Sequence, residues 1–319
     1  MSSVTARQSR RQQPLGNPDL QVTLRDYHQP RVTADTYTVE ATHDLIHPDL
    51  PPDYKDRLPK PVSQSFEVRA VQFLLDTGYV HSAYPPAGST GRYTSVLPHI
   101  TLSRDVLPWE RRLQGIRVDE RAPWLALLVF AEDELPADPS AAGVIIERPV
   151  ADLLTPPRGL HGPAIDPASV PTDVLDSYCR TIDVPVSVFE KIVPREDELL
   201  YTAHTREVTV PSYRSNGDVI EPGEFAVLTA TRFPRDEGSY VVHLVSLEGF
   251  EGRLDEGALP AAETVRLCSL HVWAFACDTT NTLDPDALLR GLADHGREDP
   301  HETGTRIPRY RGRIGCHRI

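Results

Sequence analysis

The stretch that decides the fold is Pro123-Trp124-Leu125-Ala126-Leu127-Leu128-Val129-Phe130, near the end of the informative region 84–135. All eight residues are apolar, so residues 124–130 are predicted to form a strand in the middle of a sheet that is covered on both faces. Three proline-containing motifs precede it: Tyr84-Pro85-Pro86, Leu97-Pro98-His99-Ile100 and Leu107-Pro108-Trp109-Glu110-Arg111. Together they indicate a rigid scaffold, and they contain no recognisable nucleophile–base pair, phosphate loop or metal cluster.

Two further segments upstream have strand character. Residues 65–75 place Phe66, Val68 and Ala70 in alternation with Glu67 and Arg69, which predicts a half-buried strand. Residues 96–102 predict another strand, and Pro98 favours an edge position or a bulge because proline cannot donate a backbone hydrogen bond.

The remaining pattern completes a mainly β prediction within an α+β class, with antiparallel or mixed sheets or a β-sandwich. Strands are expected at 207–210, 225–231, 239–246 and 266–277, and short helices at 171–178 and 188–193. A C-terminal helix is expected from Asp284, followed by Pro285 in its first turn. The predicted divisions are a flexible arm (1–18), a β-rich subdomain (19–150), a proline-rich connector with short helices (151–200), a second β-rich subdomain with the C-terminal helix (201–296) and a basic tail (297–319).

Composition restricts the classes of function. The chain has 319 residues, 39% hydrophobic and 25% charged, with a net charge of −13, and this acidity argues against a nucleic-acid partner. No apolar run approaches the roughly 20 residues that span a bilayer. The N-terminus lacks an apolar signal segment, so a cytoplasmic protein without a membrane span is expected. Arginines nevertheless gather at both ends, and we predict that they bind partner subunits: Arg7, Arg10, Arg11, Arg309, Arg311 and Arg313.

The four cysteines, Cys179, Cys268, Cys277 and Cys316, form no CxxC pair, and buried, reduced thiols are expected. Neither a metal nor an organic cofactor is predicted, because no other cluster has ligand spacing.

Several residues are of types that carry out chemistry. His99 or His243 could act in a hydrolase with Ser246 or Asp105, but no third orienting group has motif spacing, and a structural role is favoured. A surface turn is preferred to a phosphate loop for residues 88–91, because the Gly-Lys-Ser/Thr ending is missing. A solvated strand exit is preferred to a cation site for residues 132–134, and the His–Arg segment 201–207 is interpreted as structural.

Tryptophans offer one more alternative. Trp109, Trp124 and Trp273 could line a carbohydrate platform, although core packing is the more common role of tryptophan beside apolar strands. A carbohydrate- or receptor-binding module would require these aromatic rings to form an exposed cluster.

The motif set resembles a family of structural proteins encoded in gene clusters for contractile, phage-tail-like injection systems. The resemblance rests on the proline motifs, on Val96–Leu102 and Pro123–Phe130, and on three downstream segments, Thr181–Pro185, Ala203–Val208 and His243–Gly249. It covers residues 64–277. It implies a non-enzymatic component that is cytoplasmic and assembled into a particle, either an adaptor at the cap end of the tube or sheath or a baseplate piece. The expected partners are tube, sheath, cap or baseplate proteins, and further copies of the chain itself.

Overall fold

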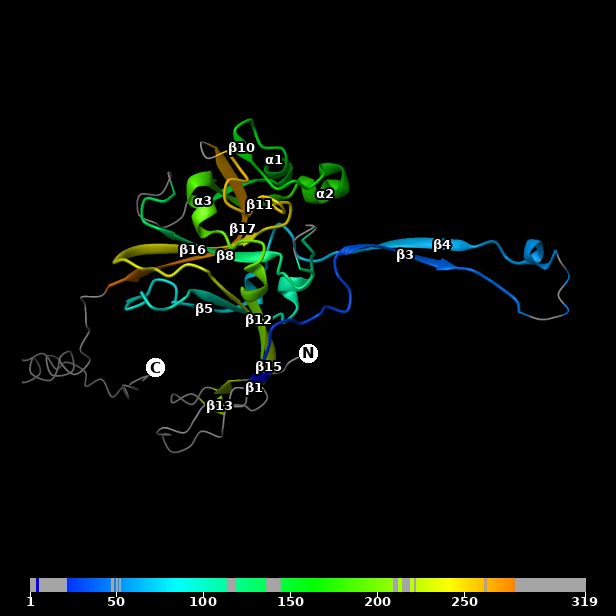
Figure 1. Cartoon of the computed structure of the whole chain (residues 1–319), viewed down its shortest axis with the longest axis horizontal. Helices are drawn as coiled ribbons and strands as arrows, with labels where there is room; N and C mark the ends of the chain where they lie inside the picture. The colour runs from blue at the N-terminus through cyan, green and yellow to red at the C-terminus, as the bar shows by residue number, and fades with distance from the viewer. Residues whose placement is uncertain are drawn as a thin grey trace, which may run out of the picture.

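The computed structural model describes residues 4–5, 22–46, 49, 51, 53–113, 119–135, 145–208, 212–213, 219–220, 222–260 and 263–278. Strand greatly exceeds helix in these residues, which confirms the mainly β prediction. Two sheets make up the body, and a two-stranded arm projects from it (Figure 1). The expected helix from Asp284, the basic tail 297–319 and all of the expected arm 1–18 except residues 4–5 lie outside the described residues. Within that arm, Val4–Thr5 form a short strand.

The first sheet has six strands and is antiparallel throughout. Its order across the sheet is β1 (Val4–Thr5), β2 (Val22–Arg25), β12 (Ala203–Val208), β15 (Gly223–Thr229), β7 (His99–Leu102) and β5 (Val80–Tyr84).

The second sheet has seven strands, five of which lie in the order β8 (Leu125–Ala131), β16 (Gly238–Ser246), β17 (Thr264–Cys277), β11 (Tyr178–Pro185) and β9 (Ile146–Pro149). Two short strands pair in parallel with β17, namely β10 (Leu160–His161) and β6 (Thr90–Gly91). Both sheets therefore draw strands from the ranges 19–150 and 201–296, so these two ranges interleave and do not form separate sheets.

The remaining elements are short. A small ribbon pairs β13 (Ser212–Tyr213) with β14 (Val219–Ile220), and the arm pairs β3 (Asp35–Ala41) with β4 (Val62–Val68). The α-helices are α1 (Val150–Leu154), α2 (Thr172–Leu175) and α3 (Val186–Ile192). Of these, α2 and α3 correspond to the helices predicted at 171–178 and 188–193. The 3-10 turns are η1 (Tyr54–Arg57), η2 (Thr77–Tyr79), η3 (Leu107–Trp109), η4 (Pro167–Ser169) and η5 (Leu199–Tyr201).

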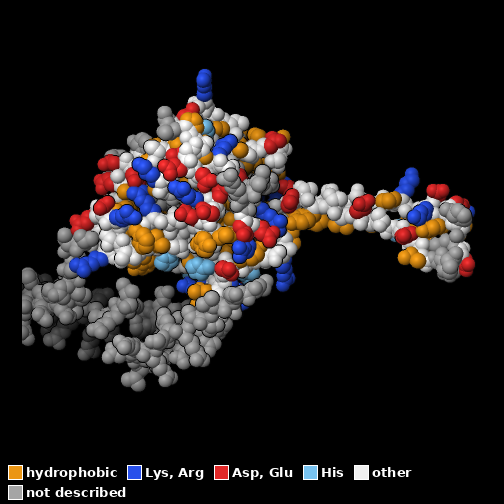
Figure 2. All heavy atoms as spheres, viewed as in Figure 1, with side chains coloured by type: hydrophobic (Ala, Val, Ile, Leu, Met, Phe, Trp, Pro, Cys, Tyr) orange, Lys and Arg blue, Asp and Glu red, His pale blue; other side chains and the backbone are white. Residues whose placement is uncertain are grey.

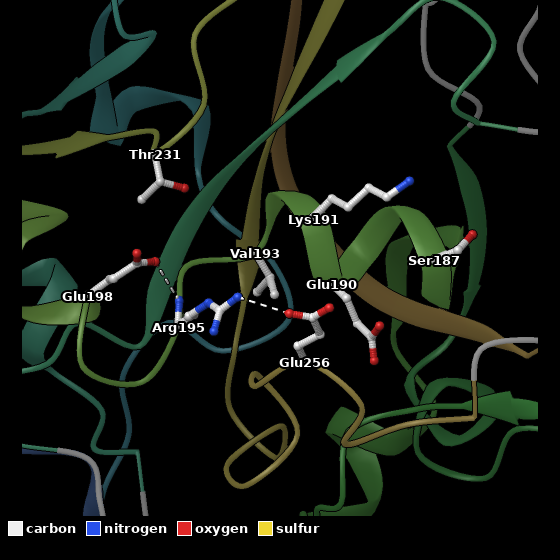
Figure 3. Close-up of a pocket in the computed structure, with 8 residues that line it drawn as sticks. All are labelled: Ser187, Glu190, Lys191, Val193, Arg195, Glu198, Thr231 and Glu256. Atoms are coloured by element: carbon white, nitrogen blue, oxygen red, sulfur yellow. Dashed lines mark hydrogen bonds and ion pairs between the residues drawn. The ribbon is translucent and has the colours of Figure 1, made fainter.

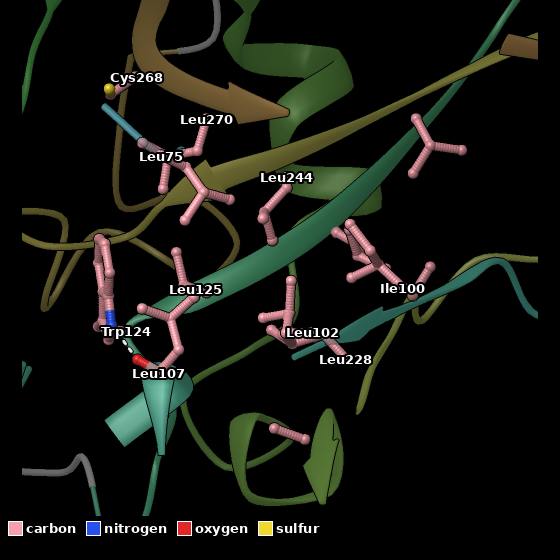
Figure 4. Packing of buried hydrophobic residues seen from close by; sticks show 14 of the residues in the cluster. Leu75, Ile100, Leu102, Leu107, Trp124, Leu125, Leu228, Leu244, Cys268 and Leu270 are labelled. Atoms are coloured by element: carbon pink, nitrogen blue, oxygen red, sulfur yellow. Dashed lines mark hydrogen bonds between the residues drawn. The ribbon is translucent and has the colours of Figure 1, made fainter. Parts of the chain in front are cut away.

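Strand β8 separates two buried clusters. Its residues Leu125, Leu127 and Val129 join the core between the two sheets, which also contains Ile100, Leu102 and Leu228 of the six-stranded sheet (Figure 4). The alternate residues of β8, Ala126, Leu128 and Phe130, pack with α3 and the segment 247–259 on the other side of the seven-stranded sheet. The prediction that this strand is covered on both faces is confirmed.

The predicted place of β8 within its sheet was wrong. Among the described strands it is the last in the order and pairs only with β16, so no described strand covers its other backbone edge. Side chains close this edge, because Arg232 Nη1 donates to the Val129 carbonyl at 3.0 Å and the Ala131 N–H donates to Glu134 Oε2 at 2.7 Å. Arg232 and Glu134 also form an ion pair with each other. This ion pair therefore blocks a strand edge that could otherwise pair with a strand of another molecule.

Two other strand predictions need correction. Strand β7 lies between β15 and β5, so it is not an edge strand, and Pro98 precedes it. The register irregularity nearby falls in β5, between Val80 and Ser82. The strand predicted at 65–75 begins at Val62 and ends at Val68. Val62 and Phe66 are 67% and 48% exposed, whereas Val68 is half-buried. The alternation was correct, but no described element of the body covers the face at Val62 and Phe66.

Candidate docking arm and neighbouring sites

The arm is an amphipathic ribbon. Strands β3 and β4 pair in register from Asp35 opposite Val68 to Ala41 opposite Val62, over a length of about 23 Å. Since side chains alternate between faces, one face carries Tyr37, Val39, Ala41, Val62, Phe66 and Val68 together with the polar residues Asp35 and Gln64, whereas the other carries Thr36, Thr38, Glu40, Ser63, Ser65 and Glu67.

The apolar face is unburied. Val39 is 59% exposed, Val62 67% and Phe66 48%, and Ile46 near the tip is 97% exposed. Figure 2 shows hydrophobic side chains along one side of the arm and again at its end. The Tyr37 and Phe66 rings stack on this face with centroids 5.8 Å apart, and on the polar face the Thr38 and Ser65 hydroxyls are 2.8 Å apart. Cross-strand pairs of this kind set the register of a ribbon that lacks a third strand.

The chain entering the arm is fixed to the motif Leu107–Arg111. The Ala34 N–H, directly before β3, donates to the Glu110 carbonyl at 2.8 Å. Tyr27 packs edge-on against Trp109 with ring centroids 5.6 Å apart, and Trp109 Nε1 donates to the Arg121 carbonyl at 2.8 Å. Thus the motif holds the incoming side of the arm.

The chain leaving the arm is fixed to the same motif through Glu248. Arg111 forms a bidentate pair with this carboxylate at 2.7 and 2.8 Å, and Gln72 donates to it at 3.0 Å. The next residue, Phe73, is buried, and its carbonyl accepts from Cys268 Sγ at 3.4 Å. We call Trp109, Glu110, Arg111, Gln72 and Glu248 the arm mount.

Glu110 is a buried charge within this mount. It is 4% exposed and forms an ion pair with Arg104, while its Oε2 accepts no hydrogen bond from any described residue. Burial raises the pKa of the Glu110 carboxyl above its usual value, with Arg104 opposing the rise and Asp105 adding to it.

A pH dependence follows from this carboxyl. Because its folded-state pKa lies above the unfolded value, the native state binds more protons between the two values, and the free energy of unfolding falls as the pH rises through that window. Glu110→Gln removes this titration. We expect its stability relative to wild type to increase as the pH rises from about 4 towards 7, measured by urea unfolding at each pH. Glu147→Gln, at an exposed carboxylate, serves as the control, and parallel behaviour of the two variants would contradict the assignment.

His99 and His243, the two histidines considered for a hydrolase, contact groups that hold the fold. His99 Nδ1 is 3.1 Å from the Leu97 carbonyl, and its ring stacks on Tyr84. His243 is fully buried with Nδ1 2.8 Å from Ser269 Oγ. Ser246 lies three residues further along the same strand, and the alternation of a strand directs it to the opposite face.

Two further histidines, His81 and His204, lie on strands of the six-stranded sheet. Burial lowers the pKa of His204, and the positive charges of Arg206 and His99 lower it further. The His81 ring lies 4.7 Å from the Phe225 ring. The segment 201–207 begins with Tyr201 at the end of η5 and contributes residues 203–207, including His204 and Arg206, to β12 of the six-stranded sheet.

The remaining motifs also take structural roles. Residues 88–91 form a turn whose Gly88 N–H donates to the Ala274 carbonyl at 2.7 Å and then a short strand, β6, against β17. Of the carboxylates 132–134, Glu134 closes the β8 edge with Arg232 as described above. Cys179, Cys268 and Cys277 are buried and free, as expected, whereas Cys316 lies outside the described residues.

A surface depression with a volume of about 440 Å³ lies beside α3 (Figure 3). Four of the charged groups that line it bind one another or the backbone. Arg195 donates to Glu256 at 3.3 Å through its side chain and to Glu198 at 3.0 Å through its N–H, and Glu190 accepts from the Gly257 N–H. These contacts fix the loops around α3 and do not converge on a common point in the depression.

The predicted arginines Arg7, Arg10, Arg11, Arg309, Arg311 and Arg313 all lie outside the described residues, so their role in partner binding stays a prediction. The arm itself was missed, although alternation in 62–68 facing a second alternating run in 35–41 was the available signal. Within the described residues, no helix is long and apolar enough to cross a membrane. Comparison of the chain with models of protein families, with curated protein sequences and with solved structures gave no match.

Proposed function

We propose that this protein is a non-enzymatic structural subunit of a contractile, phage-tail-like injection particle, and that it binds a neighbouring subunit through the apolar face of the β3–β4 arm. The observation that carries the docking role is the unburied apolar face of a ribbon held away from the body (Figure 1). The particle itself is suggested by the motif resemblance described above.

An isolated two-stranded ribbon is at best marginally stable in water, and three strands or a packing surface normally support it. Exposed, contiguous apolar surface on a protein marks an interaction site. Val39, Val62 and Phe66 supply such a surface here, and the polar residues opposite them suit solvent. The partner that fits is an apolar groove on an adjacent subunit, which covers one face of the ribbon and leaves the other wet.

The arm mount supports the same role. Because both ends of the ribbon are tied to Leu107–Arg111, directly or through Glu248, the direction of the arm is set by the body. A preorganised arm loses less conformational entropy when it binds than a free loop does. In this proposal the chain serves as an adaptor at the cap end of the tube or sheath, or as a baseplate piece, in cytoplasmic particles that contain several copies of it.

The two alternatives have less support. A carbohydrate- or receptor-binding module needs exposed aromatic rings, but Trp109, Trp124 and Trp273 are 3%, 0% and 5% exposed. A hydrolase needs a nucleophile and a base that converge in a cleft, but His99 and His243 contact the Leu97 carbonyl and Ser269, and His243 and Ser246 lie on opposite faces of β16.

The test is co-purification from native cells. We expect the wild-type chain to bring tube, sheath, cap or baseplate proteins with it, and the triple variant Val39→Ser/Val62→Ser/Phe66→Ser to lose at least about 90% of that recovery, because a central apolar contact carries most interface energy. The matched control, Thr36→Ala/Glu40→Ala/Ser63→Ala, changes the polar face of the same two strands and should assemble normally.

Circular dichroism of both triple variants checks that the body remains folded. Undiminished assembly of the apolar-face variant would disprove docking through the arm. A wild-type chain that brings down none of these particle proteins would instead disprove the assignment to an injection particle, so the two parts of the proposal can be contradicted separately.

A further inference from the structure

Three side chains from separate segments converge where the arm meets the six-stranded sheet. His28 follows β2, Asp105 lies between β7 and η3, and Glu224 belongs to β15. One potential ligand atom from each lies within 4.8 Å of the other two, and all three residues are half-buried. We propose that they bind a divalent first-row transition-metal ion.

The histidine provides the most direct indication. His28 Nδ1 is inaccessible to solvent and lies 2.9 Å from Asp105 Oδ2, yet the two atoms lack hydrogen-bond geometry, and Nδ1 has no hydrogen-bond partner among the described residues. Two ligands bound to one zinc ion at about 2.1 Å each sit about 3 to 3.5 Å apart and point at the ion, not at each other. The His28–Asp105 arrangement matches that relation.

The donor set indicates which ions fit. One imidazole nitrogen and two carboxylate oxygens suit zinc, manganese or iron(II), whereas calcium and magnesium prefer oxygen ligands alone. Three protein ligands leave further coordination positions for water.

The positively charged side chain of Arg25 lies beside the proposed metal site. Arg25 Nη1 is 3.0 Å from Glu224 Oε1, and Arg25 Nη2 is 2.7 Å from Glu207 Oε2. A carboxylate has two oxygens, so Glu224 can keep one on Arg25 and offer the other to the ion. Glu207 neutralises the remaining charge of Arg25, which limits its repulsion of the metal.

The position suggests what the ion would do. His28 lies on the chain between β2 and the arm, while Asp105 and Glu224 are held by the sheet, where the Thr205 hydroxyl donates to the Asp105 carbonyl at 3.4 Å. A bound ion would therefore tie the chain that enters the arm to β15 and to the segment that follows β7. Binding only to the folded state raises the melting temperature by mass action.

Titration calorimetry with zinc on the tag-free full chain tests the site. We expect one ion per chain for wild type, a rise in melting temperature with zinc, and little response to magnesium or calcium. His28→Ala and Asp105→Asn should weaken zinc binding by more than the tenfold to roughly 100-fold that loss of an outer-shell partner costs. The matched control is His161→Ala, because His161 is a half-buried histidine paired with a single carboxylate, Glu263, and it should bind zinc like wild type.

Cobalt(II) absorption distinguishes this site from the cysteines, since bound cobalt should show d–d bands without thiolate charge transfer. Glu224→Gln provides a third ligand variant if His28→Ala does not fold. Three outcomes would each overturn the proposal: no zinc uptake by wild type at micromolar metal, unchanged affinity in folded ligand variants, or thiolate bands in the cobalt spectrum.

Discussion

Trp124→Ala is expected to lower the free energy of unfolding by about 3 to 5 kcal/mol, the usual cost of removing a fully buried aromatic side chain. Trp124 is 0% exposed and lies where the proline motifs meet β8 (Figure 4). Its Nε1 donates to the Leu107 carbonyl at 2.8 Å, and its backbone N–H donates to the Pro108 carbonyl at 3.0 Å. Truncation therefore opens a cavity and leaves the buried Leu107 carbonyl with one described hydrogen bond, the longer one from the Glu110 N–H at 3.4 Å. Urea unfolding followed by circular dichroism measures the loss.

A pair of conservative variants isolates the hydrogen bond from the packing. Trp124→Phe keeps a ring but removes the indole donor, so the Leu107 carbonyl keeps only the 3.4 Å bond from the Glu110 N–H among the described donors. Trp273, in contrast, is 5% exposed, and its Nε1 donates to no acceptor among the described residues. We expect Trp273→Phe to be milder than Trp124→Phe by about 1 to 2 kcal/mol, because it removes an unsatisfied donor and creates none. Equal losses in the two variants would contradict the role given to the Trp124–Leu107 hydrogen bond.

The sequence was sufficient to predict elements whose residue pattern is set by burial. The uninterrupted apolar run 124–130 indicated a strand buried on both faces, and Leu125 and Leu128 indeed lie in different clusters. It did not indicate that β8 ends its sheet, because a run that is apolar on both faces looks the same in the middle and at a protected edge. The protection comes from Arg232, a residue distant in sequence.

For residues 62–68 the sequence predicted the strand but not the exposure of its apolar face. Alternation shows that a strand has one apolar face, but it cannot show whether that face packs within the same chain or against a different chain. The sequence therefore predicted burial for Phe66, which is 48% exposed. The cluster proposed as a metal site has no sequence signal for a related reason, since His28, Asp105 and Glu224 have no spacing motif and are brought together only by the order of β2, β12, β15 and β7 in one sheet.

The arm mount yields the second large effect. Arg111 and Glu248 are 15% and 17% exposed at their side chains and share two hydrogen bonds. Arg111→Met removes the cation but keeps most of the side-chain volume, so Glu248 stays largely desolvated with Gln72 as its remaining described side-chain donor. Removing one partner of a buried pair costs about 3 to 5 kcal/mol, and the partial exposure here places the expectation near the lower end, about 3 kcal/mol. Chemical denaturation of the purified variant measures it.

The charge left behind, and not the loss of attraction, is the cause we assign, and a double-mutant cycle tests this. Arg111→Met/Glu248→Gln should recover more than half of the loss, because it removes the unpaired charge as well. Arg57→Met is the control, since Arg57 and Asp53 form an exposed pair in the arm, and it should cost less than about 1 kcal/mol. Hydrogen exchange adds a local readout: the amides of residues 70–75 should lose protection in Arg111→Met, because Glu248 holds Gln72 there. Unchanged exchange in that segment, together with a loss below about 1 kcal/mol, would show that Arg111 and Glu248 do not hold the arm to the body.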